Sequence, residues 1–324
     1  MNTSDINTND QGVVLKKVMG SYSVYAGERT ITCSLSARLR AGKNSASRRN
    51  ASQAVHADPI VVGDVVRFTP SGNGMGQIVE VLPRRNRLAR RMPGAHAVEQ
   101  VIVANLDQVV PVFAAANPAP HWNMLDRYLV SAEAFELPAL ICITKLDLAG
   151  GEAELQGAVK QYRQAGYPVI LTSALTGEGI AELKQALQGR LSVLVGKSGV
   201  GKTLLLNTLQ PGLGLRVSAV NQVTGKGRYT TTSQEMVRLE IGGAVVDTPG
   251  EREFGLWNAE AAHASELALL FPEMRPLVGR CRFGLDCRHD EEPGCAIRRA
   301  VMDGKISPRR YQSYMRLQEE LRTP

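Results

Sequence analysis

A glycine-rich octapeptide, GKSGVGKT at residues 196–203, constrains this chain more than any other feature. It fits the pattern G-x-x-x-x-G-K-[ST] and lies between an apolar run, Leu191–Val195, and a stretch of helical character, Lys202–Leu209. In such a strand, loop and helix, backbone N–H groups surround a phosphate, the lysine reaches the outer phosphates and the hydroxyl holds Mg²⁺. We therefore expect a nucleotide-binding loop with a catalytic Lys202 and a magnesium-binding Thr203; its residues are Gly196, Lys197, Ser198, Gly199, Val200, Gly201, Lys202 and Thr203.

The central region alternates apolar runs with helical stretches. The apolar runs favour buried strands and lie at Val109–Ala115, Ala139–Thr144, Val169–Thr172, Leu191–Val195 and Ala244–Val246. The stretches between them favour helices at Met124–Phe135, Glu152–Ala165, Gly179–Leu187 and Lys202–Leu209. This alternation predicts a parallel, doubly wound α/β sheet, in which ligands bind at the carboxyl ends of the strands.

Two further elements follow strands of this sheet and indicate guanine recognition. The tetrapeptide TKLD at residues 144–147 fits the pattern [NT]-K-x-D, and SAL at residues 173–175 is similar to an accessory element whose backbone contacts guanine O6. A carboxylate at Asp147 can accept two hydrogen bonds from guanine, whereas adenine offers no matching donor pair. Alone, TKLD would indicate a surface turn. Its position after a strand favours a base site formed by Thr144, Lys145, Asp147, Ser173 and Ala174.

Two segments are candidates for sensing the γ-phosphate. DTPG at residues 247–250 supplies a D-x-x-G pattern, with Asp247 as the acidic partner of Mg²⁺ and the Gly250 amide as the sensor. Residues 225–233, GKGRYTTTS, are typical of a loop whose threonine closes on Mg²⁺, although a polar hairpin is the alternative. The sequence leaves open which threonine does so, and the candidate catalytic residues are Lys202, Asp247, Gly250, Thr231 and Thr232, with Thr230 as the neighbouring possibility.

The order of these elements is unusual. In ordinary GTPases the phosphate loop comes first and the base-reading elements come last, but here residues 144–147 and 173–175 precede residues 196–203. A circular permutation keeps the spatial site because only the connections between elements move. We therefore expect a circularly permuted P-loop domain.

A compact cysteine and histidine cluster lies near the C-terminus. Its spacing is Cys281-x5-Cys287-x-His289-x5-Cys295. Three thiolates and one imidazole complete a tetrahedral zinc site and leave no position for a catalytic water. We expect one structural zinc ion; the alternative is three spare buried cysteines with an incidental histidine.

Residues 12–110 contain short β segments separated by Gly, Asn and Pro, which predict a small barrel. The segments include Ser21–Tyr25, Thr30–Leu35, Val61–Thr69 and Gly76–Leu82. Two basic clusters fall in this module, and each indicates either solvated surface charge or a nucleic-acid-binding surface. They are Arg38–Arg49 and the group Arg84, Arg85, Arg87, Arg90 and Arg91.

Charge and composition limit the class of protein. The chain of 324 residues carries a net charge of +7, and its basic excess lies in the flanks, with net +6 over residues 1–111, −2 over 112–272 and +3 over 273–324. This distribution indicates a polyanionic partner. No apolar run reaches the ~18 residues of a membrane span, and the polar N-terminus lacks the features of a signal peptide. We expect a disordered tail at residues 1–11 and a cytoplasmic monomer that does not bind membranes.

These features together resemble the circularly permuted GTPase family called RsgA, also YjeQ or EngC, whose members assist maturation of the bacterial small ribosomal subunit. The resemblance covers roughly residues 12–315 and includes VVGDVV at 61–66, the segment Gln100–Glu133, FGLW at 254–257, the motif order and the zinc pattern. It implies an OB-fold that binds RNA at residues 12–110, a GTPase domain with GTP and Mg²⁺ at 111–272, and a mainly helical zinc domain with a basic tail at 273–324. It also implies slow intrinsic hydrolysis that the small subunit stimulates.

Three residues depart from the pattern of that family. Thr144 stands where the family usually has Asn, although a threonine can still donate and accept a hydrogen bond. Tyr229 replaces a histidine before the threonine triplet, and Glu251 replaces a hydrophobic residue after DTPG. The sequence therefore leaves the group that orients the attacking water undecided.

We interpret the chain as a GTP-hydrolysing switch. GTP with Mg²⁺ orders the sensor segments, the basic flanks bind ribosomal RNA of the small subunit during late maturation, and hydrolysis to GDP releases the protein. A site without a catalytic glutamine should be slow until a partner completes it. The alternative is a GTP-gated, rRNA-binding assembly scaffold with negligible hydrolysis. A P-loop ATPase or kinase would require Asp147 to be incidental.

Overall fold

The computed structural model describes residues 11–18, 20–40, 60–91, 99–150, 153–215, 235–247 and 266–322. The chain groups into two compact units. One comprises residues 1–107, 187–194 and 229–249, and the other comprises residues 108–186, 195–228 and 250–324. None of the helices in the described ranges combines the length and hydropathy that a membrane crossing requires.

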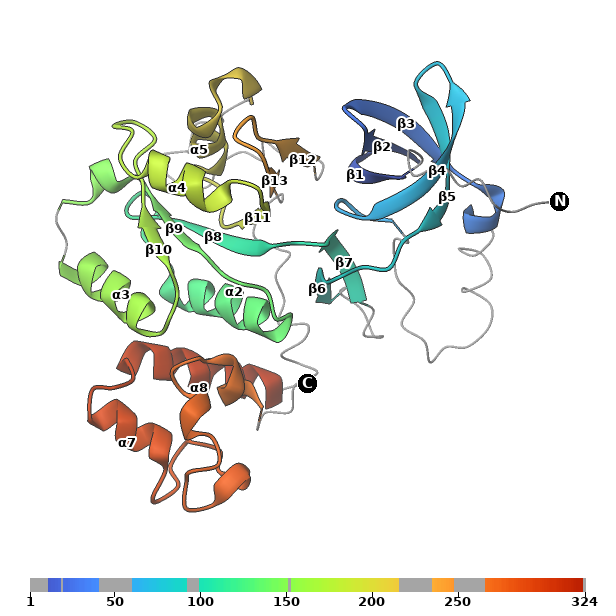
Figure 1. The fold of residues 1–324 in the computed structure, drawn as a ribbon. Helices are drawn as coiled ribbons and strands as arrows, with labels where there is room; N and C mark the ends of the chain where they lie inside the picture. The colour runs from blue at the N-terminus through green and yellow to red at the C-terminus, as the bar shows by residue number, and fades with distance from the viewer. Residues whose placement is uncertain are drawn as a thin grey trace. The chain divides into compact units, whose positions relative to one another are not determined.

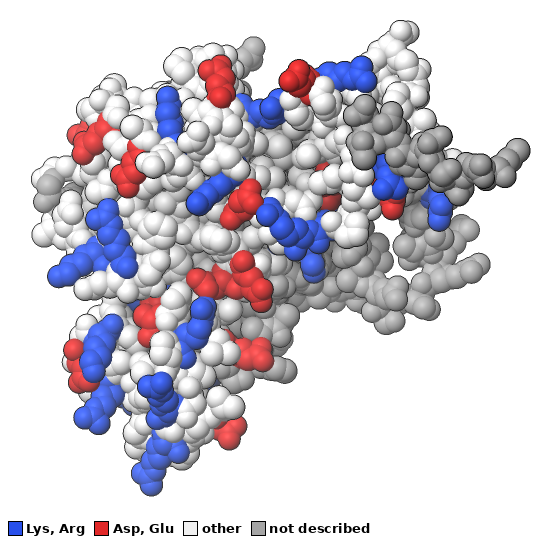
Figure 2. Space-filling model, in the orientation of Figure 1, with Lys and Arg blue, Asp and Glu red and all other residues white. Residues whose placement is uncertain are grey.

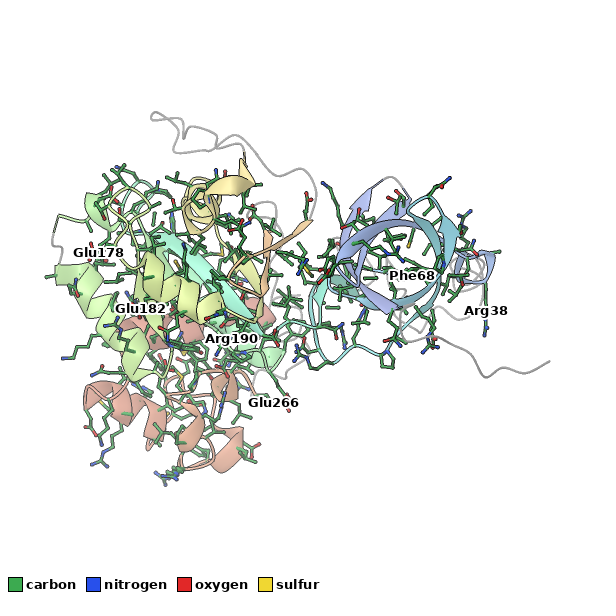
Figure 3. The ribbon with its side chains drawn as sticks, turned by 45° about the horizontal axis from the view of Figure 1, so that its top comes forward. Arg38, Phe68, Glu178, Glu182, Arg190 and Glu266 are labelled. Carbon is green, nitrogen blue, oxygen red and sulfur yellow. The ribbon has the colours of Figure 1, made fainter. Side chains whose placement is uncertain are left out.

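Five strands of the first unit close a barrel. They are β1 Gln11–Val18, β2 Ser21–Ala26, β3 Arg29–Leu35, β4 Val65–Gly72 and β5 Met75–Val81. The pairs β1–β2, β2–β3, β3–β5 and β4–β5 form the wall, and β1–β4 closes it. Alternate side chains point inward, so Val14, Ile31, Phe68 and Ile78 fill the interior, and Figure 3 looks into the barrel at Phe68. The barrel expected from the sequence is confirmed.

The first unit also contains strands outside the barrel. The parallel pair is β11 Leu191–Val195 with β13 Ala244–Asp247, and a separate hairpin joins β6 Arg87–Arg91 to β7 Glu99–Ala104. Strand β12, Glu235–Arg238, is antiparallel to both β13 and β1. The sequence did not predict β12, because its four residues contain a single fully buried side chain and give no clear periodicity.

The buried Asp64 and its ion pair with Arg84 correct two expectations about the barrel module, namely where one strand begins and whether Arg84 is a surface charge. The predicted strand Val61–Thr69 begins instead at Val65, because the Asp64 carboxylate accepts a hydrogen bond from the Val61 backbone N–H at 2.8 Å and forms a turn. The fully buried Asp64 also accepts hydrogen bonds from Arg84 Nε at 2.6 Å and Nη2 at 2.8 Å. Arg84 therefore stabilises the fold and is not a free surface charge for RNA. Arg85 is 61% exposed and pairs with Asp107 at 2.7 Å.

The second unit contains a parallel sheet with helices on both sides (Figure 1). Strands β8, β9 and β10 are almost wholly buried, as expected for strands covered on both faces. The strands are β8 Gln108–Ala114, β9 Ile141–Thr144 and β10 Val169–Leu171, and the helices are α2 Trp122–Ala134, α3 Ala153–Gln164, α4 Ile180–Leu187 and α5 Lys202–Leu209, with a short 3₁₀ turn η2 at Leu146–Leu148. This arrangement confirms the expected doubly wound α/β class.

The C-terminal segment of the second unit packs against α2. It consists of 3₁₀ turns η4 Leu267–Leu270, η5 Arg275–Leu277 and η6 Gly284–Asp286, followed by α7 Ala296–Met302 and α8 Pro308–Arg322. Arg310 of α8 is 1% exposed and donates to Asp126 Oδ1 of α2 at 2.8 Å and to Glu273 Oε1 at 2.6 Å. The Tyr162 hydroxyl of α3 also donates to Asp126, at 2.8 Å. A buried guanidinium needs such carboxylate partners, so this network fixes α8 against α2 and α3.

We expect Arg84→Ala to lower the free energy of unfolding by about 2–4 kcal/mol, because the substitution leaves the buried carboxylate of Asp64 without its cation. Arg85→Ala is the matched control, and it should cost about 1 kcal/mol or less because Arg85 is largely exposed. Urea unfolding followed by circular dichroism measures both. Equal stability of the two variants would contradict the structural role of Arg84.

Candidate nucleotide and metal sites

The backbone of the glycine-rich loop has the conformation that a phosphate cradle needs. Gly196 has a φ of 155°, and a Cβ at this position would lie 2.2 Å from the carbonyl oxygen of Val112 in β8. Gly199 and Gly201 also have positive φ, at 87° and 99°. Side chains would strain or block these positions, so glycine allows successive N–H groups to follow a concave path.

Lys202, the first residue of α5, holds its ammonium group inside this loop. The side chain is buried, and Nζ donates to the carbonyl oxygens of Gly196 at 2.6 Å and Lys197 at 3.2 Å. The loop thereby keeps a positive charge within reach of any phosphate that its N–H groups bind. The arrangement suits the stabilisation of charge on a phosphoryl group.

Thr144, at the end of β9, links the predicted base site to the phosphate loop. Its Oγ1 lies 2.5 Å from the carbonyl oxygen of Val200 and 3.2 Å from that of Phe113, and the residue is 3% exposed. A hydroxyl has one proton, so the shorter distance favours donation to Val200. The threonine found in place of asparagine therefore braces the loop.

The carboxylate of Asp147 is oriented by Ser173. The Ser173 hydroxyl donates to Asp147 Oδ1 at 2.5 Å and accepts from the backbone N–H groups of Leu175 and Thr176 at 3.3 Å and 3.2 Å. The Leu146 N–H also donates to the Thr172 carbonyl at 3.1 Å, which joins the loops after β9 and β10. The two predicted base-reading segments are therefore adjacent, and Asp147 itself is exposed. Ala174 lies in the same turn.

Lys145 is held beside these loops by a backbone contact. Its φ is 57° and its Nζ donates to the carbonyl oxygen of Asn117. Partial burial lowers the pKa of the Lys145 ammonium, and the negative charge of Asp147 opposes this shift. The alkyl chain of Lys145 offers an apolar surface for a planar base.

Asp247 and Thr203 each carry a side-chain oxygen of the kind that Mg²⁺ prefers. Asp247 is the last residue of β13, is 8% exposed, and is in register with Leu194 of β11 and Glu235 of β12. Thr203 is the second residue of α5. The other predicted sensor and departure residues, Gly250, Thr231, Thr232, Thr230, Tyr229 and Glu251, lie outside the described residues.

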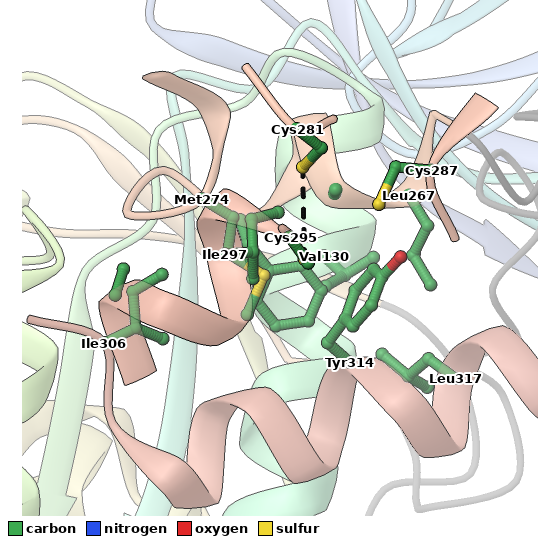
Figure 4. Close-up of a cluster of buried hydrophobic side chains, with 13 residues drawn as sticks. Val130, Leu267, Met274, Cys281, Cys287, Cys295, Ile297, Ile306, Tyr314 and Leu317 are labelled. Carbon is green, nitrogen blue, oxygen red and sulfur yellow. Dashed lines mark hydrogen bonds between the residues drawn. The ribbon is translucent and has the colours of Figure 1, made fainter. Parts of the chain in front are cut away.

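The four predicted zinc ligands lie close together, and Figure 4 shows the three cysteines among them. Nδ1 of His289 lies 3.4 Å from the Cys281 sulfur and 3.5 Å from the Cys295 sulfur, and these two sulfurs are 3.9 Å apart. A tetrahedral zinc ion, with bonds of about 2.3 Å to sulfur and 2.0 Å to nitrogen, separates two sulfurs by about 3.8 Å and sulfur from nitrogen by about 3.5 Å. With Cys287, all four ligand atoms lie within 4.8 Å of one another. The donor set therefore fits zinc.

Burial alone opposes ionisation of the thiols in this cluster, whereas backbone donors beside it suit metal-bound thiolates. Burial raises the pKa of the Cys287 thiol to about 12, and it raises the pKa of Cys295 and lowers that of His289. Backbone N–H groups of Ala296 and Arg298 point at the sulfurs of Cys281 and Cys295, at 3.3 Å and 3.4 Å. A bound cation displaces thiol protons, and these donors then stabilise the thiolates.

Two contacts at the site could not be found from the sequence. Gly196 approaches the carbonyl oxygen of Val112, and Lys145 donates to that of Asn117. Every residue type offers a backbone carbonyl, so no side-chain pattern marks these positions. Only the fold brings them to the loops.

Comparisons with known proteins agree with this geometry. The family model described as RsgA GTPase matches residues 81–257. The small ribosomal subunit biogenesis GTPase RsgA of Gemmatimonas aurantiaca is 45% identical over 98% of this chain and 99% of its own length, and that of Moorella thermoacetica is 40% identical over 94% and 95%. The crystal structure of YjeQ from Thermotoga maritima matches with a TM-score of 0.73 and 33% identity over 97% of this chain and 99% of its own. YloQ, a circularly permuted GTPase, matches with a TM-score of 0.70 and 28% identity over 100% and 99%.

We expect Thr144→Val to weaken nucleotide binding about three- to tenfold, because the Val200 carbonyl loses a buried hydrogen bond. Thr144→Ser is the matched control and should bind nearly as the unmodified protein does, because it keeps the hydroxyl. Titration with a fluorescent GDP derivative measures the dissociation constants. Equal affinities for the valine and serine variants would show that the hydroxyl does not brace the loop.

We expect about one zinc ion per chain by elemental analysis, and its loss in His289→Ala. Removing a ligand also removes the free energy of metal binding from the stability of the C-terminal segment, so the variant should be more readily cleaved by proteases within residues 273–322. His121→Ala removes an imidazole outside the cluster and should leave both properties unchanged. Full zinc content in His289→Ala would argue against this ligand set.

Proposed function

This chain belongs to the RsgA family of GTPases, and we propose that it hydrolyses GTP in the biogenesis of the small ribosomal subunit. The family recognised from the motifs and the fold class expected from them, a barrel followed by a circularly permuted GTPase domain, are confirmed. The hydrogen bond between Thr144 and Val200 is the observation that carries the proposal for this chain. This hydrogen bond connects the predicted guanine-binding segment to the predicted phosphate loop, although the two residues are 56 positions apart in the sequence.

In the proposed base site, Asp147 accepts hydrogen bonds from guanine and Lys145 covers one face of the base. The hydrogen bond from Ser173 supports this role because it fixes the orientation of the Asp147 carboxylate before the nucleotide binds. A fixed carboxylate loses less conformational entropy on binding. Thr144, Ser173 and Ala174 complete the site from the ends of β9 and β10.

In the proposed phosphate site, residues 196–203 surround the β- and γ-phosphates with N–H groups. Lys202 exchanges its contacts with the loop carbonyls for contacts with phosphate oxygens, and Thr203 and Asp247 provide oxygen ligands for Mg²⁺. The ion, when bound, neutralises charge on the phosphates. Gly250, Thr231 and Thr232 are proposed to respond to the γ-phosphate.

We propose three domains for this activity, at residues 12–110, 111–272 and 273–324. The zinc ligands Cys281, Cys287, His289 and Cys295 hold the third domain together, and zinc supplies a structural crosslink there. The Arg310 network supports a fixed attachment of this domain to α2. A cytoplasmic monomer agrees with a ribosomal partner.

The proposed RNA-binding surface comprises the barrel and the C-terminal segment. Basic side chains gather over α7 and α8 on the face in Figure 2. In the barrel module, the Arg85 side chain is exposed, whereas the Arg84 side chain is held in an ion pair with Asp64. The GTP form binds ribosomal RNA in this proposal, and hydrolysis releases it.

Turnover of GTP with and without purified small ribosomal subunits tests the proposed activity. We expect slow hydrolysis by the protein alone and at least a tenfold acceleration by the subunits, because a partner completes the charge stabilisation at the phosphates. Lys202→Ala should abolish hydrolysis and leave the circular dichroism spectrum unchanged. Lys160→Ala, on the exposed side of α3, is the matched control and should hydrolyse normally.

No acceleration by subunits, with nucleotide-dependent binding retained, would instead favour a GTP-gated assembly scaffold. Equal turnover of ATP and GTP would contradict guanine recognition by Asp147.

A further inference from the structure

Within the first unit, strand β12 pairs with β1 of the barrel on one side and with β13 on the other. The strand begins at Glu235, two positions after the proposed sensor loop at residues 225–233. Its partner β13 ends at Asp247, the first residue of the second sensor segment. The hairpin β12–β13 therefore connects the two segments proposed to sense the γ-phosphate, and its outer strand pairs with β1 of the barrel.

One row of residues crosses from the barrel to Asp247. Lys16 of β1 is in register with Glu235 of β12, and Glu235 is in register with Asp247 of β13. Residues directly opposite each other in antiparallel strands project from the same face of the sheet. These two pairings connect Asp247 to β1 without an intervening loop.

The course of β1 allows it to pair both with the barrel strands and with β12. Between Val14 and Lys16 the strand shifts register against β2, which marks a β-bulge. Residues 11–13 pair with β4 and close the barrel, whereas Lys16 pairs with β12. A bulge bends its strand, so β1 can leave the barrel wall and reach the hairpin.

Two side-chain contacts reinforce the pairing. Lys16 Nζ lies 2.6 Å from Glu235 Oε2, and the guanidinium of Arg238 lies 3.8 Å from the ring centre of Tyr25 in β2. An ion pair or a cation–π contact of this exposure changes an equilibrium about two- to fivefold. Both contacts join a barrel strand to β12.

We propose that Lys16, Tyr25, Glu235 and Arg238 are positioning residues that couple the nucleotide state to RNA binding by the barrel. The coupling rests on the proposed function, in which GTP and GDP forms differ in their affinity for the small subunit. Coupling between two binding sites is reciprocal, so subunit binding at the barrel also changes nucleotide affinity through the same strand. Strain on β12 during nucleotide exchange is shared with β1.

The test measures the affinity of the full chain for purified small ribosomal subunits in GDP and in a nonhydrolysable GTP analogue. The ratio of the two dissociation constants is the readout, because a purely structural defect would weaken both alike. Tyr25→Leu removes the aromatic ring, and Tyr25→Phe is its control because it keeps the ring. Lys16→Gln removes the cation, and Lys17→Gln is its control because neighbouring side chains on a strand point to opposite faces.

We expect Tyr25→Leu and Lys16→Gln each to reduce the ratio about two- to fivefold, and the double variant to reduce it further. The two controls should keep the ratio of the unmodified protein. An unchanged ratio in the double variant overturns the inference and leaves the proposed function intact.

Hydrogen exchange in the free protein separates the two proposals. The amides of β1 should exchange at different rates in the GDP and analogue forms, and the double variant should lose this difference. Equal exchange in both forms of the unmodified protein overturns the inference. An affinity ratio of one in the unmodified protein, with nucleotide-dependent exchange in β1, overturns the proposed GTP-gated binding instead.

Discussion

The contact between the Thr144 hydroxyl and the Val200 carbonyl is the constraint on which the proposed nucleotide site depends. The predicted base-reading segments follow β9 and β10, whereas the predicted phosphate loop follows β11, so tertiary contacts determine their relative position. The bond from Leu146 to Thr172 and the bond from Ser173 to Asp147 continue the same chain of contacts across the loops after β9 and β10. Buried hydrogen bonds of this kind lose the most when one partner is left unsatisfied.

Arginine pairs determine how other parts of the structure are held. Arg84 donates hydrogen bonds from two nitrogen atoms to the buried carboxylate of Asp64. Arg310 likewise donates from two nitrogen atoms to Glu273, and its third nitrogen donates to Asp126. The planar guanidinium fixes both distance and angle, which a lysine ammonium would not do. The net positive charge of the chain therefore includes arginines that stabilise the fold through buried ion pairs, as well as basic residues exposed at the surface.

The sequence predicted those parts of the fold that have strong periodicity or strict residue requirements. Strand β11 and helix α5 have the expected limits, because an apolar run, three glycines and a helical stretch leave little choice. The cluster of three cysteines and one histidine could be predicted as a zinc site because few residue types bind zinc, and the structure brings these four residues together. Strand β12 was missed because its pairing, and not its composition, makes it a strand. The sequence does not reveal the structural role of Arg84, which it places in a basic cluster that is either solvated or RNA-binding, because the partner Asp64 lies 20 positions away.

The double role of β1 has a consequence for how far the barrel is a separate domain. Removal of β1 would leave Glu235, the first residue of β12, without its partner Lys16 on that side. Exposed edges of this kind recruit strands from other molecules, and natural proteins cover or charge them. Strand β1 thus covers the start of β12, and a chain shortened to remove it would expose this end of the edge strand to pairing with other molecules, for reasons unrelated to RNA.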